Sequence, residues 1–278
     1  MRCLVVGGSG LVGSHLLAAC SDRRYATLGT AYTRPTADFA ALDVRDADAV
    51  HELLADYQPD VTFLTTPPSG PGGGAGNVAA AVARTGGTLV AVGGDEVFGE
   101  CPAARNEAHA VAPATARGRE QVAAETAIRA ALPDRHLILR GSWAFGTDGG
   151  DQLADWVRSW DRNRVVAAAT DRDIQPTFAP DLADVALELV KAGQTGTVHV
   201  VGPDRHTEFT VARLACHVLG YDTDLVRAVD GSCDRPARVN LCRFRLRGLL
   251  GARAIRPAAD GLRAVRAARH VRPVLLAA

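Results

Sequence analysis

Glycines directly after a short valine-rich segment constrain the fold of this chain more than any other feature. Residues 3–6 read Cys-Leu-Val-Val, and residues 7–13 read Gly-Gly-Ser-Gly-Leu-Val-Gly, which satisfies both G-x-x-G-x-x-G and G-x-G-x-x-G. At a turn from strand to helix, glycines let the backbone approach a pyrophosphate, which the N–H groups and positive end of the helix then bind. We therefore expect a dinucleotide site at this turn. Its candidate residues are Gly7, Gly10, Leu11, Val12 and Gly13.

Short apolar runs alternate with helical patterns through the first two thirds of the chain. The runs typical of buried strands cover residues 3–6, 26–32, 61–64, 88–92 and 136–139. The helical patterns cover residues 11–20, 47–57, 77–84 and 114–131, with Asp46 as the expected N-cap of the second. This alternation predicts parallel strands joined by helical crossovers, in an α/β doubly wound Rossmann sheet with helices on both faces.

The pattern changes after residue 145, where helices become longer and strands fewer. We expect a dinucleotide-binding Rossmann domain of residues 1–142 and 177–201, and a smaller C-terminal α/β substrate-binding domain of residues 143–176 and 202–278. Residues 235–278 hold 11 arginines and one acid, Asp260. Arg263, Arg266 and Arg269 recur at i+3 on one face of a predicted helix, where a solvated face and an anion-binding surface both stay open.

The charge balance and the cysteines narrow the class of partner. The chain has 31 basic and 31 acidic residues and a formal net charge of +0 at pH 7, so no overall field selects nucleic acid or a membrane. We expect a small-molecule substrate, with a homodimer or a partner enzyme left open. The 6 cysteines form no C-x-x-C pair and the 8 histidines show no ligand spacing, so no metal site is expected. No signal peptide or membrane span is visible, which favours a cytoplasmic protein.

The segment about 20 residues beyond the glycines selects between the two nicotinamide dinucleotides. An Asp or Glu at the end of the second strand would bind the ribose hydroxyl of NAD, but this chain has Thr33-Arg34 there. Arg34 complements a 2′-phosphate, so NADP is favoured and NAD stays open. Asp43, followed by Val44, is placed either to contact the adenine amino group or to cap a loop. Thr65, after the strand predicted at 61–64, is a further cofactor-binding candidate.

Several motifs extend the pattern nearly from end to end. They are Leu42-Asp43-Val44-Arg45-Asp46, Gln58-Pro59-Asp60-Val61, Asp95-Glu96-Val97-Phe98-Gly99, Leu139-Arg140-Gly141-Ser142-Trp143-Ala144-Phe145-Gly146, Gln175-Pro176-Thr177, Asp181-Leu182-Ala183 and Arg235-Pro236. With the N-terminal glycines, these resemble the extended short-chain dehydrogenase/reductases, and in particular the dTDP-4-dehydrorhamnose reductase-like family that binds sugar nucleotides. The resemblance implies a nucleotide-sugar substrate. Ser142, Trp143 and Arg235 are the substrate-binding candidates.

The resemblance breaks down at the catalytic positions. Family reductases place a Ser or Thr before the Asp of the third motif and a Tyr-x-x-x-Lys pair on the next helix, where the tyrosine protonates the carbonyl oxygen as hydride arrives. Residues 113–125 match the family pattern P-x-x-x-Y-G-x-x-K-x-x-x-E at Gly118 and Glu125, so the three positions hold Gly94, Arg117 and Gln121. The chain has 4 tyrosines, and none is followed four residues later by lysine. Because arginine is a poor proton donor near neutrality, we expect this degenerate triad not to support ordinary ketone reduction.

Asp95 and Glu96 survive beside the replaced positions. In sugar-nucleotide 4,6-dehydratases, which this segment resembles, the corresponding pair acts as acid and base, whereas a role in hydrogen-bonding the loop backbone is the alternative. The candidate catalytic residues are Asp95, Glu96, Arg117 and Gln121. We expect Arg117 within a few ångströms of one of the two carboxylates, in a cavity closed by Trp143 and the Gly/Pro-rich segment 67–76, which is either a flap or a plain loop.

Three functions remain open at this point. The first is an enzyme of altered chemistry, a lyase, isomerase or unusual reductase acting on a nucleotide-linked or natural-product intermediate. The second is a non-catalytic NADP-binding subunit, similar to the regulatory subunit of methionine adenosyltransferase. The third is a residual NADPH-dependent reductase of the dTDP-4-dehydrorhamnose type. Carboxylates and an arginine converging on one site would favour the first.

Overall fold

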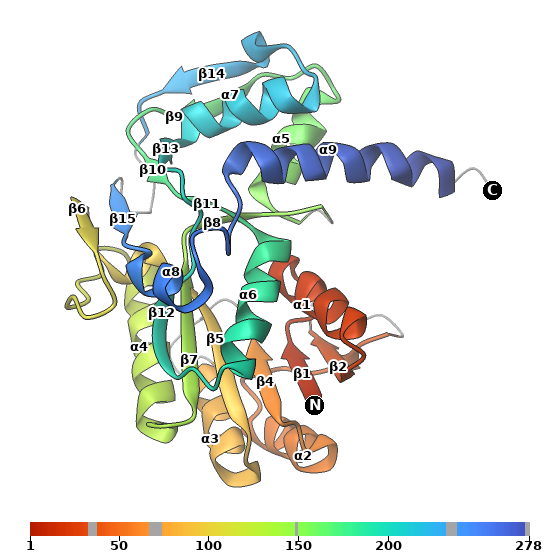
Figure 1. Ribbon diagram of the computed structural model, residues 1–278, viewed down its shortest axis with the longest axis vertical. Coiled ribbons are helices and arrows are strands. Elements are labelled where there is room, and N and C mark those ends of the chain that lie inside the picture. The colour runs from red at the N-terminus through yellow and green to blue at the C-terminus, as the bar shows by residue number, and fades with distance from the viewer. Residues whose placement is uncertain (33–37, 67–73, 148–149, 232–237, 276–278) are drawn as a thin grey trace.

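The computed structural model describes residues 1–32, 38–66, 74–147, 150–231 and 238–275. Within these residues a parallel sheet of seven strands, in the order β12-β7-β5-β4-β1-β2-β3, forms the lower half of the molecule in Figure 1. The strands are β1 (Arg2–Val6), β2 (Ala26–Ala31), β3 (Ala40–Ala41), β4 (Val61–Leu64), β5 (Thr88–Gly94), β7 (His136–Gly141) and β12 (Gly196–His199). The chain winds outward from β1 in both directions, which leaves a crevice at the carboxyl ends of β1 and β4. The predicted doubly wound α/β fold is confirmed.

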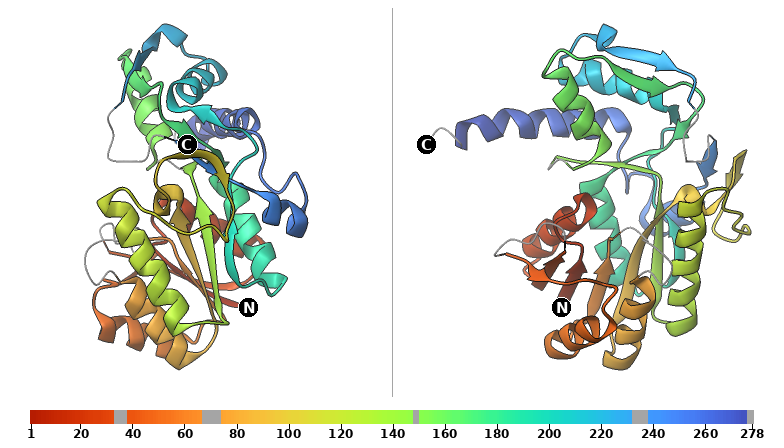
Figure 2. Two further views of the ribbon diagram at one scale, coloured as in Figure 1. Left: turned by 90° about the vertical axis from the view of Figure 1, so that its left-hand side faces the viewer. Right: turned by 180° about the vertical axis from the view of Figure 1, so that it is seen from behind.

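Helices cover both faces of this sheet, as Figures 1 and 2 show. The helices are α1 (Leu11–Asp22) and α6 (Ala179–Lys191) on one face, and α2 (Ala47–Tyr57), α3 (Ala75–Thr85) and α4 (Ala116–Ala131) on the other. Successive residues of a strand point to opposite faces, so Cys3 and Val5 pack in the core against α1 and α6, while Leu4 and Val6 pack against α2 and α3.

Local signals in the sequence account for several of the observed boundaries. The predicted helix at 47–57 and strand at 61–64 are confirmed residue for residue, and the Asp46 side chain caps α2 by accepting hydrogen bonds from the N–H groups of Asp48 and Ala49. Strands β5 and β7 run farther than predicted, to Gly94 and Gly141, because their mutual pairing continues through these glycines. The sheet therefore extends up to the candidate catalytic residues.

A smaller α/β domain forms the upper half of the molecule (Figure 1). It contains the parallel pair β9 (Val166–Ala169) and β14 (Val226–Val229), the antiparallel pair β10 (Asp173–Ile174) and β13 (His206–Thr207), and the helices α5 (Gln152–Trp160), α7 (Glu208–Leu219), η2 (Thr223–Leu225) and α9 (Ala258–Leu275). Strands β8 (Trp143–Phe145) and β11 (Pro176–Phe178) lead into this domain and pair with each other. Its core is built around stacked and tilted aromatic rings, among them Trp143, Trp156 and Trp160.

One segment differs from the expected division at residue 202. Helix α8 (Phe244–Leu250) packs beside the large sheet, because Leu246 and Ile255, both 1% exposed, belong to the same core as α1 and α6. Arg245 donates hydrogen bonds to the carbonyl oxygens of Thr195 and Thr197, which covers the open edge of β12. Strands β6 (Cys101–Arg105) and β15 (Val239–Leu241) pair with each other, which connects two segments that lie far apart in the sequence.

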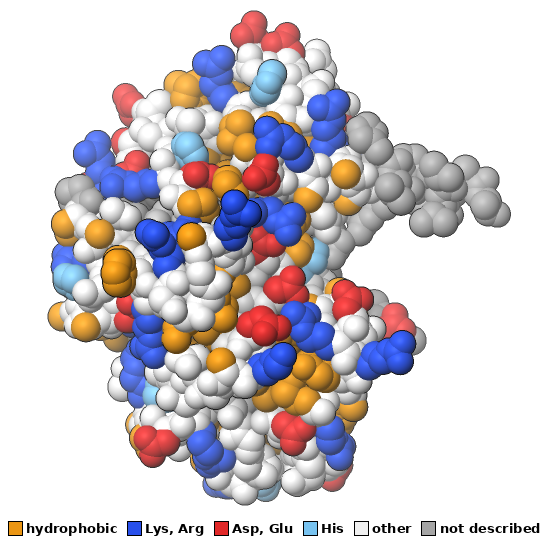
Figure 3. All heavy atoms as spheres, viewed as in Figure 1, with side chains coloured by type: hydrophobic (Ala, Val, Ile, Leu, Met, Phe, Trp, Pro, Cys, Tyr) orange, Lys and Arg blue, Asp and Glu red, His pale blue; other side chains and the backbone are white. Residues whose placement is uncertain are grey.

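On the face shown in Figure 3, basic and acidic side chains are interspersed, and neither sign of charge dominates. The three arginines predicted on one face of α9 make contacts within the chain. Arg263 forms an ion pair with Asp260, Arg269 forms one with Asp161, and Arg266 donates a hydrogen bond to the carbonyl oxygen of Val218. In the part of the chain that the structure describes, no helix is long and apolar enough to cross a membrane. No cluster of three or more metal-binding side chains is found among the same residues.

Candidate functional site

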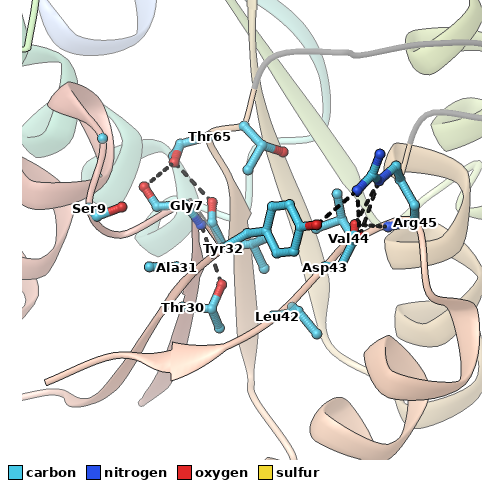
Figure 4. Close-up of a pocket in the computed structure, with 13 residues that line it drawn as sticks. Gly7, Ser9, Thr30, Ala31, Tyr32, Leu42, Asp43, Val44, Arg45 and Thr65 are labelled. Carbon is cyan, nitrogen blue, oxygen red and sulfur yellow. Dashed lines mark hydrogen bonds and ion pairs between the residues drawn. The ribbon is translucent and has the colours of Figure 1, made fainter. Parts of the chain in front are cut away.

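A hollow of about 370 Å³ opens at the carboxyl ends of the strands, in the crevice beside β1 (Figure 4). Its lining residues are Val6, Gly7, Ser9, Gly10, Thr30, Ala31, Tyr32, Leu42, Asp43, Val44, Arg45, Thr65 and Thr66. They come from the ends of β1, β2 and β4 and from the loop after β3, so the glycine turn, Asp43, Val44 and Thr65 are brought together as the sequence predicts.

The glycine turn is shaped to hold the backbone close to α1. Gly7 has a φ of 88°, a left-handed conformation that favours glycine, and a Cβ placed on Gly13 would lie 2.2 Å from the carbonyl oxygen of Gly7. The Thr65 hydroxyl donates to the carbonyl oxygens of Val6 and Gly7 at 2.9 and 3.1 Å, which fixes the turn. Any side chain at either glycine would push the turn off the helix, so the sequence requires glycine here.

The N-terminus of α1 is free to bind an anion. Leu11 and Val12 begin the helix, its first turn contains no acidic residue, and its N-cap Gly10 offers no side-chain hydrogen bond. The first N–H groups of a helix lack internal partners and carry the positive end of the helix dipole. This helix end can therefore hold the pyrophosphate of a dinucleotide.

The Asp43 carboxylate lies at the far end of the hollow and is held by Arg45. It accepts hydrogen bonds from the Arg45 backbone N–H at 3.0 Å, from Nε at 2.9 Å and from Nη2 at 2.7 Å. These hydrogen bonds and the charge of Arg45 lower the pKa of Asp43 to about 2. The hydrogen bond from the Arg45 backbone N–H is a loop cap, one of the two predicted roles, and contact with the adenine amino group stays a prediction. Thr33-Arg34, the predicted NADP-selecting pair, lies outside the described residues.

Tyr32 and Arg45 are pocket residues that the motif analysis missed. Tyr32 directly follows β2 and is 58% exposed, and its hydroxyl accepts a hydrogen bond from Arg45 Nη2 at 3.2 Å. Both residues adjoin motifs that are visible in the sequence: Arg45 lies inside the Leu-Asp-Val-Arg-Asp motif, and Tyr32 directly precedes Thr33. The pairing of residues 13 apart across the hollow needs the tertiary structure.

Arg117, which the sequence aligns with the family tyrosine, is part of an ion pair. Arg117 Nε donates to Glu96 Oε2 at 2.8 Å, which confirms the predicted proximity. Glu96 belongs to the short helix η1 (Asp95–Val97) directly after β5, and Arg117 belongs to the first turn of α4. The Glu96 side chain is 9% exposed and that of Arg117 is 53% exposed, so the pair joins a buried carboxylate to an accessible guanidinium.

Gly118 brings the two partners together. A Cβ on Gly118 would lie 2.1 Å from the carbonyl oxygen of Glu96, so only glycine lets α4 approach η1 this closely. Gln121, one turn later and 8% exposed, lies against Gly93, where a Cβ would be 2.3 Å from the Gln121 amide nitrogen. Gly94 is less crowded, because among the described residues a Cβ there meets only the Glu96 nitrogen, at 3.9 Å. The absence of a Ser or Thr at this position therefore has no steric cause.

A buried ion pair fixes α4 against the sheet. Arg140 of β7 donates to both oxygens of Glu125 at 3.0 and 2.7 Å, and the two side chains are 2% and 1% exposed. Burial acts to raise the pKa of Glu125, but the hydrogen bonds and charges of Arg140, and then of Arg129, outweigh burial and leave that pKa lowered. The pair lies one turn beyond Gln121, so it holds the helix that carries Arg117 and Gln121. In the sequence Glu125 served only to establish the alignment.

The substrate-side candidates are placed as follows. The Ser142 hydroxyl accepts a hydrogen bond from the Gln175 N–H at 3.3 Å. Trp143 is 5% exposed, stacks on Phe145 and Trp156, and donates its indole N–H to Gln152 at 2.8 Å. Its ring is part of the aromatic core of the smaller domain, and contact with a substrate stays a prediction. Arg235 and residues 67–73 of the Gly/Pro-rich segment lie outside the described residues.

The sheet order and the glycine turn define a Rossmann-type dinucleotide-binding protein of the extended short-chain dehydrogenase/reductase class. Comparison with known proteins is more specific. The family model described as the RmlD substrate binding domain matches residues 72–243. The probable low-salt glycan biosynthesis reductase Agl14 of Haloferax volcanii is 31% identical over 261 residues, covering 85% of this chain and 87% of its own length. The chain belongs to the RmlD substrate-binding domain family, as its motifs predicted.

Further similar proteins agree with this assignment. The dTDP-4-dehydrorhamnose reductase of Streptomyces griseus is 30% identical over 246 residues, with 81% of this chain and 79% of the relative covered. A crystal structure of dTDP-4-dehydrorhamnose reductase from Bacillus anthracis, in complex with NADP, superposes with a TM-score of 0.81 at 22% identity, covering 94% of this chain and 97% of that one. At that identity the superposition shows the shared fold.

Proposed function

We propose that the protein binds NADP(H) in the hollow beside β1 and a nucleotide-linked sugar at the adjoining carboxyl ends of β5 and β7. The support for the cofactor is the contact between Gly13 and Gly7, the uncapped N-terminus of α1, and a similar fold solved with NADP. The support for the substrate class is membership of a family whose similar members are named as reductases of dTDP-4-dehydrorhamnose. NADP(H), when bound, supplies a hydride donor or acceptor.

We further propose that the catalytic positions favour proton abstraction over protonation of a ketone. The observation that carries this is the ion pair of Glu96 and Arg117 at the position of the family tyrosine. A carboxylate paired with a guanidinium accepts protons and hydrogen bonds, whereas the tyrosine donates. Glu96 would take a proton from a carbon next to a carbonyl group, and the electron pair of the broken C–H bond would pass to the carbonyl oxygen as an enolate. The Nη groups of Arg117 would stabilise that oxyanion.

Solvent exchange tests this chemistry directly. The protein is incubated with NADP⁺ and dTDP-4-dehydrorhamnose in D₂O, and NMR follows the loss of the C–H signals on the carbons next to the ketone. We expect the protein to accelerate deuterium incorporation, and Glu96→Gln to abolish the acceleration. Arg119→Gln is the matched control, because Arg119 is exposed on the same helix and makes no ion pair among the described residues.

The other functions predict different results when the exchange mixture is compared with a second mixture that contains NADPH in place of NADP⁺. Oxidation of NADPH by this ketone, without exchange, would overturn proton abstraction in favour of a residual reductase. Neither exchange nor oxidation, with NADPH bound, would favour a non-catalytic binding subunit. A protein that binds no dinucleotide would overturn the proposed function as a whole.

Calorimetry tests the cofactor assignment. We expect tighter binding of NADPH than of NADH, since Thr33-Arg34 ends the second strand without an acid, and Arg34→Ala should remove the preference. Gly13→Ala should abolish binding of both, because its Cβ has no room beside Gly7. Gly248→Ala is the control glycine substitution, since no described atom lies within 4 Å of the added carbon. Equal affinity for both cofactors in the wild type would contradict the NADP assignment.

A further inference from the structure

The hollow beside β1 contains an arrangement of flat groups that dinucleotide motifs do not explain. Figure 4 shows the Tyr32 ring reaching across the hollow, with its hydroxyl toward Arg45. The central carbon of the Arg45 guanidinium lies 5.4 Å from the centre of the Tyr32 ring, in a cation–π contact. An aromatic ring and a planar cation from opposite sides of the hollow thus lie together before any ligand enters.

Asp43 determines which part of the guanidinium a ligand can meet. The Nε–H group is bonded to Asp43, and Nη2 donates both to Asp43 and to Tyr32. The edge formed by these atoms is therefore committed within the protein, and what the group retains is its planar face and the Nη1 atom. A phosphate is recognised through guanidinium N–H edges, whereas a flat ring is recognised through the face. The arrangement thus suits a flat ligand.

Apolar residues also line the hollow. Ala31, Leu42 and Val44 are among its lining residues, together with Tyr32. Purine bases are flat and stack on aromatic rings and on arginine planes. The glycine turn, which would hold the pyrophosphate, lines the same hollow. A base attached to that pyrophosphate would therefore reach the Tyr32 and Arg45 pair.

We propose that Tyr32 and Arg45 form a stacking wall for the adenine base of the dinucleotide, with Asp43 as the positioning residue that orients Arg45. This inference rests on the proposed function and names the side chains that recognise the base. Because the base is common to NAD and NADP, the wall contributes equally to both and leaves discrimination of the 2′-phosphate to other residues. Asp43 then acts through Arg45, in place of the direct contact with the adenine amino group that the sequence left open.

Calorimetric titration with ADP and with 2′,5′-ADP tests the wall without a substrate. Tyr32→Leu and Arg45→Met should each weaken binding of both ligands by about 5- to 30-fold, the range expected for loss of one stacking partner. Tyr32→Phe keeps the ring and should stay within about 2-fold of the wild type. Arg84→Met, at the far end of α3, is the matched control. Both pocket side chains are more than half exposed, so thermal melting should show these variants folded.

The possible results separate the inference from the proposed function. Unchanged affinity in both Tyr32→Leu and Arg45→Met would overturn the stacking wall. A loss confined to 2′,5′-ADP in Arg45→Met would overturn it as well, and would identify Arg45 as a phosphate ligand. A wild-type protein that binds neither ADP nor 2′,5′-ADP would instead refute the dinucleotide site itself.

Discussion

The triple variant Gly94→Ser, Arg117→Tyr, Gln121→Lys places the three family side chains at the positions that the sequence predicts for them. Two of the positions have room: a side chain at Gly94 meets only a distant atom among the described residues, and Arg117 is half exposed. The third, Gln121, is 8% exposed and already carries a long side chain. Positions 117 and 121 are one helical turn apart, so a tyrosine and a lysine there would lie on one face of α4. We expect this variant to reduce dTDP-4-dehydrorhamnose with NADPH, and the wild type not to.

The expected changes in stability and in rate follow from the geometry of the Arg117–Glu96 ion pair, which the triple variant breaks. Removing Arg117 takes one ion-pair partner from Glu96, which is 9% exposed, but Arg117 is half exposed, so solvent already weakens the pair. We therefore expect a loss of about 1–2 kcal/mol in the free energy of unfolding, which a domain with a stability of about 5–15 kcal/mol tolerates. A positioned general acid typically contributes ~10²–10⁴ in rate, and this is the gain expected for the triple variant.

The assay is the absorbance decrease of NADPH in the presence of dTDP-4-dehydrorhamnose. Gly94→Ser combined with Arg119→Tyr is the control, because it places a tyrosine on the same helix but away from Glu96. Wild-type turnover in the usual enzyme range of ~1–10³ s⁻¹ would refute the reasoning, since another group would then supply the proton. A folded triple variant that binds NADPH yet shows no gain would refute it equally.

Three further predictions concern the support of the site. Glu125→Ala should lower the free energy of unfolding by about 3–5 kcal/mol in urea titrations, because Arg140 would stay buried without its partner, whereas Arg129→Ala, at a half-exposed arginine, should cost about 1 kcal/mol or less. Folding lowers the pKa of Glu125 below its unfolded value of roughly 4.3. The stability that the ionised Glu125 contributes should therefore be complete above that unfolded pKa and be lost as the pH falls through the lower folded pKa. In the same urea titrations, the Glu125→Ala variant should lack this loss of stability at low pH. Gly118→Ala should cost about 1–3 kcal/mol and abolish the deuterium exchange by moving α4 off η1, and a variant as stable and active as Gly248→Ala would contradict that role of Gly118.

Features that depend on neighbouring residues were predictable from the sequence. The glycine turn, the bounds of α2 and β4, and the Asp46 cap follow from local backbone geometry and from hydrogen bonds that span a few residues. The sequence also predicts replacement of the family catalytic side chains, because Gly118 and Glu125 match the family pattern, and this replacement stays a prediction. Membership of the family followed from motifs spread over most of the chain.

Features that depend on contacts between distant segments were decided by the tertiary structure. Arg117 and Glu96 are 21 residues apart, and only the close approach of Gly118 to η1 sets their 2.8 Å contact. The sequence could not show that Arg45 donates hydrogen bonds to the Asp43 carboxylate. The orientation of Arg45 also depends on its hydrogen bond to Tyr32, which the tertiary structure places at the end of β2. Likewise, the burial of Trp143 and the return of α8 to the large sheet depend on which apolar surfaces the other elements leave uncovered. Local patterns specify elements, whereas packing over long sequence separations decides which side chains meet at the site.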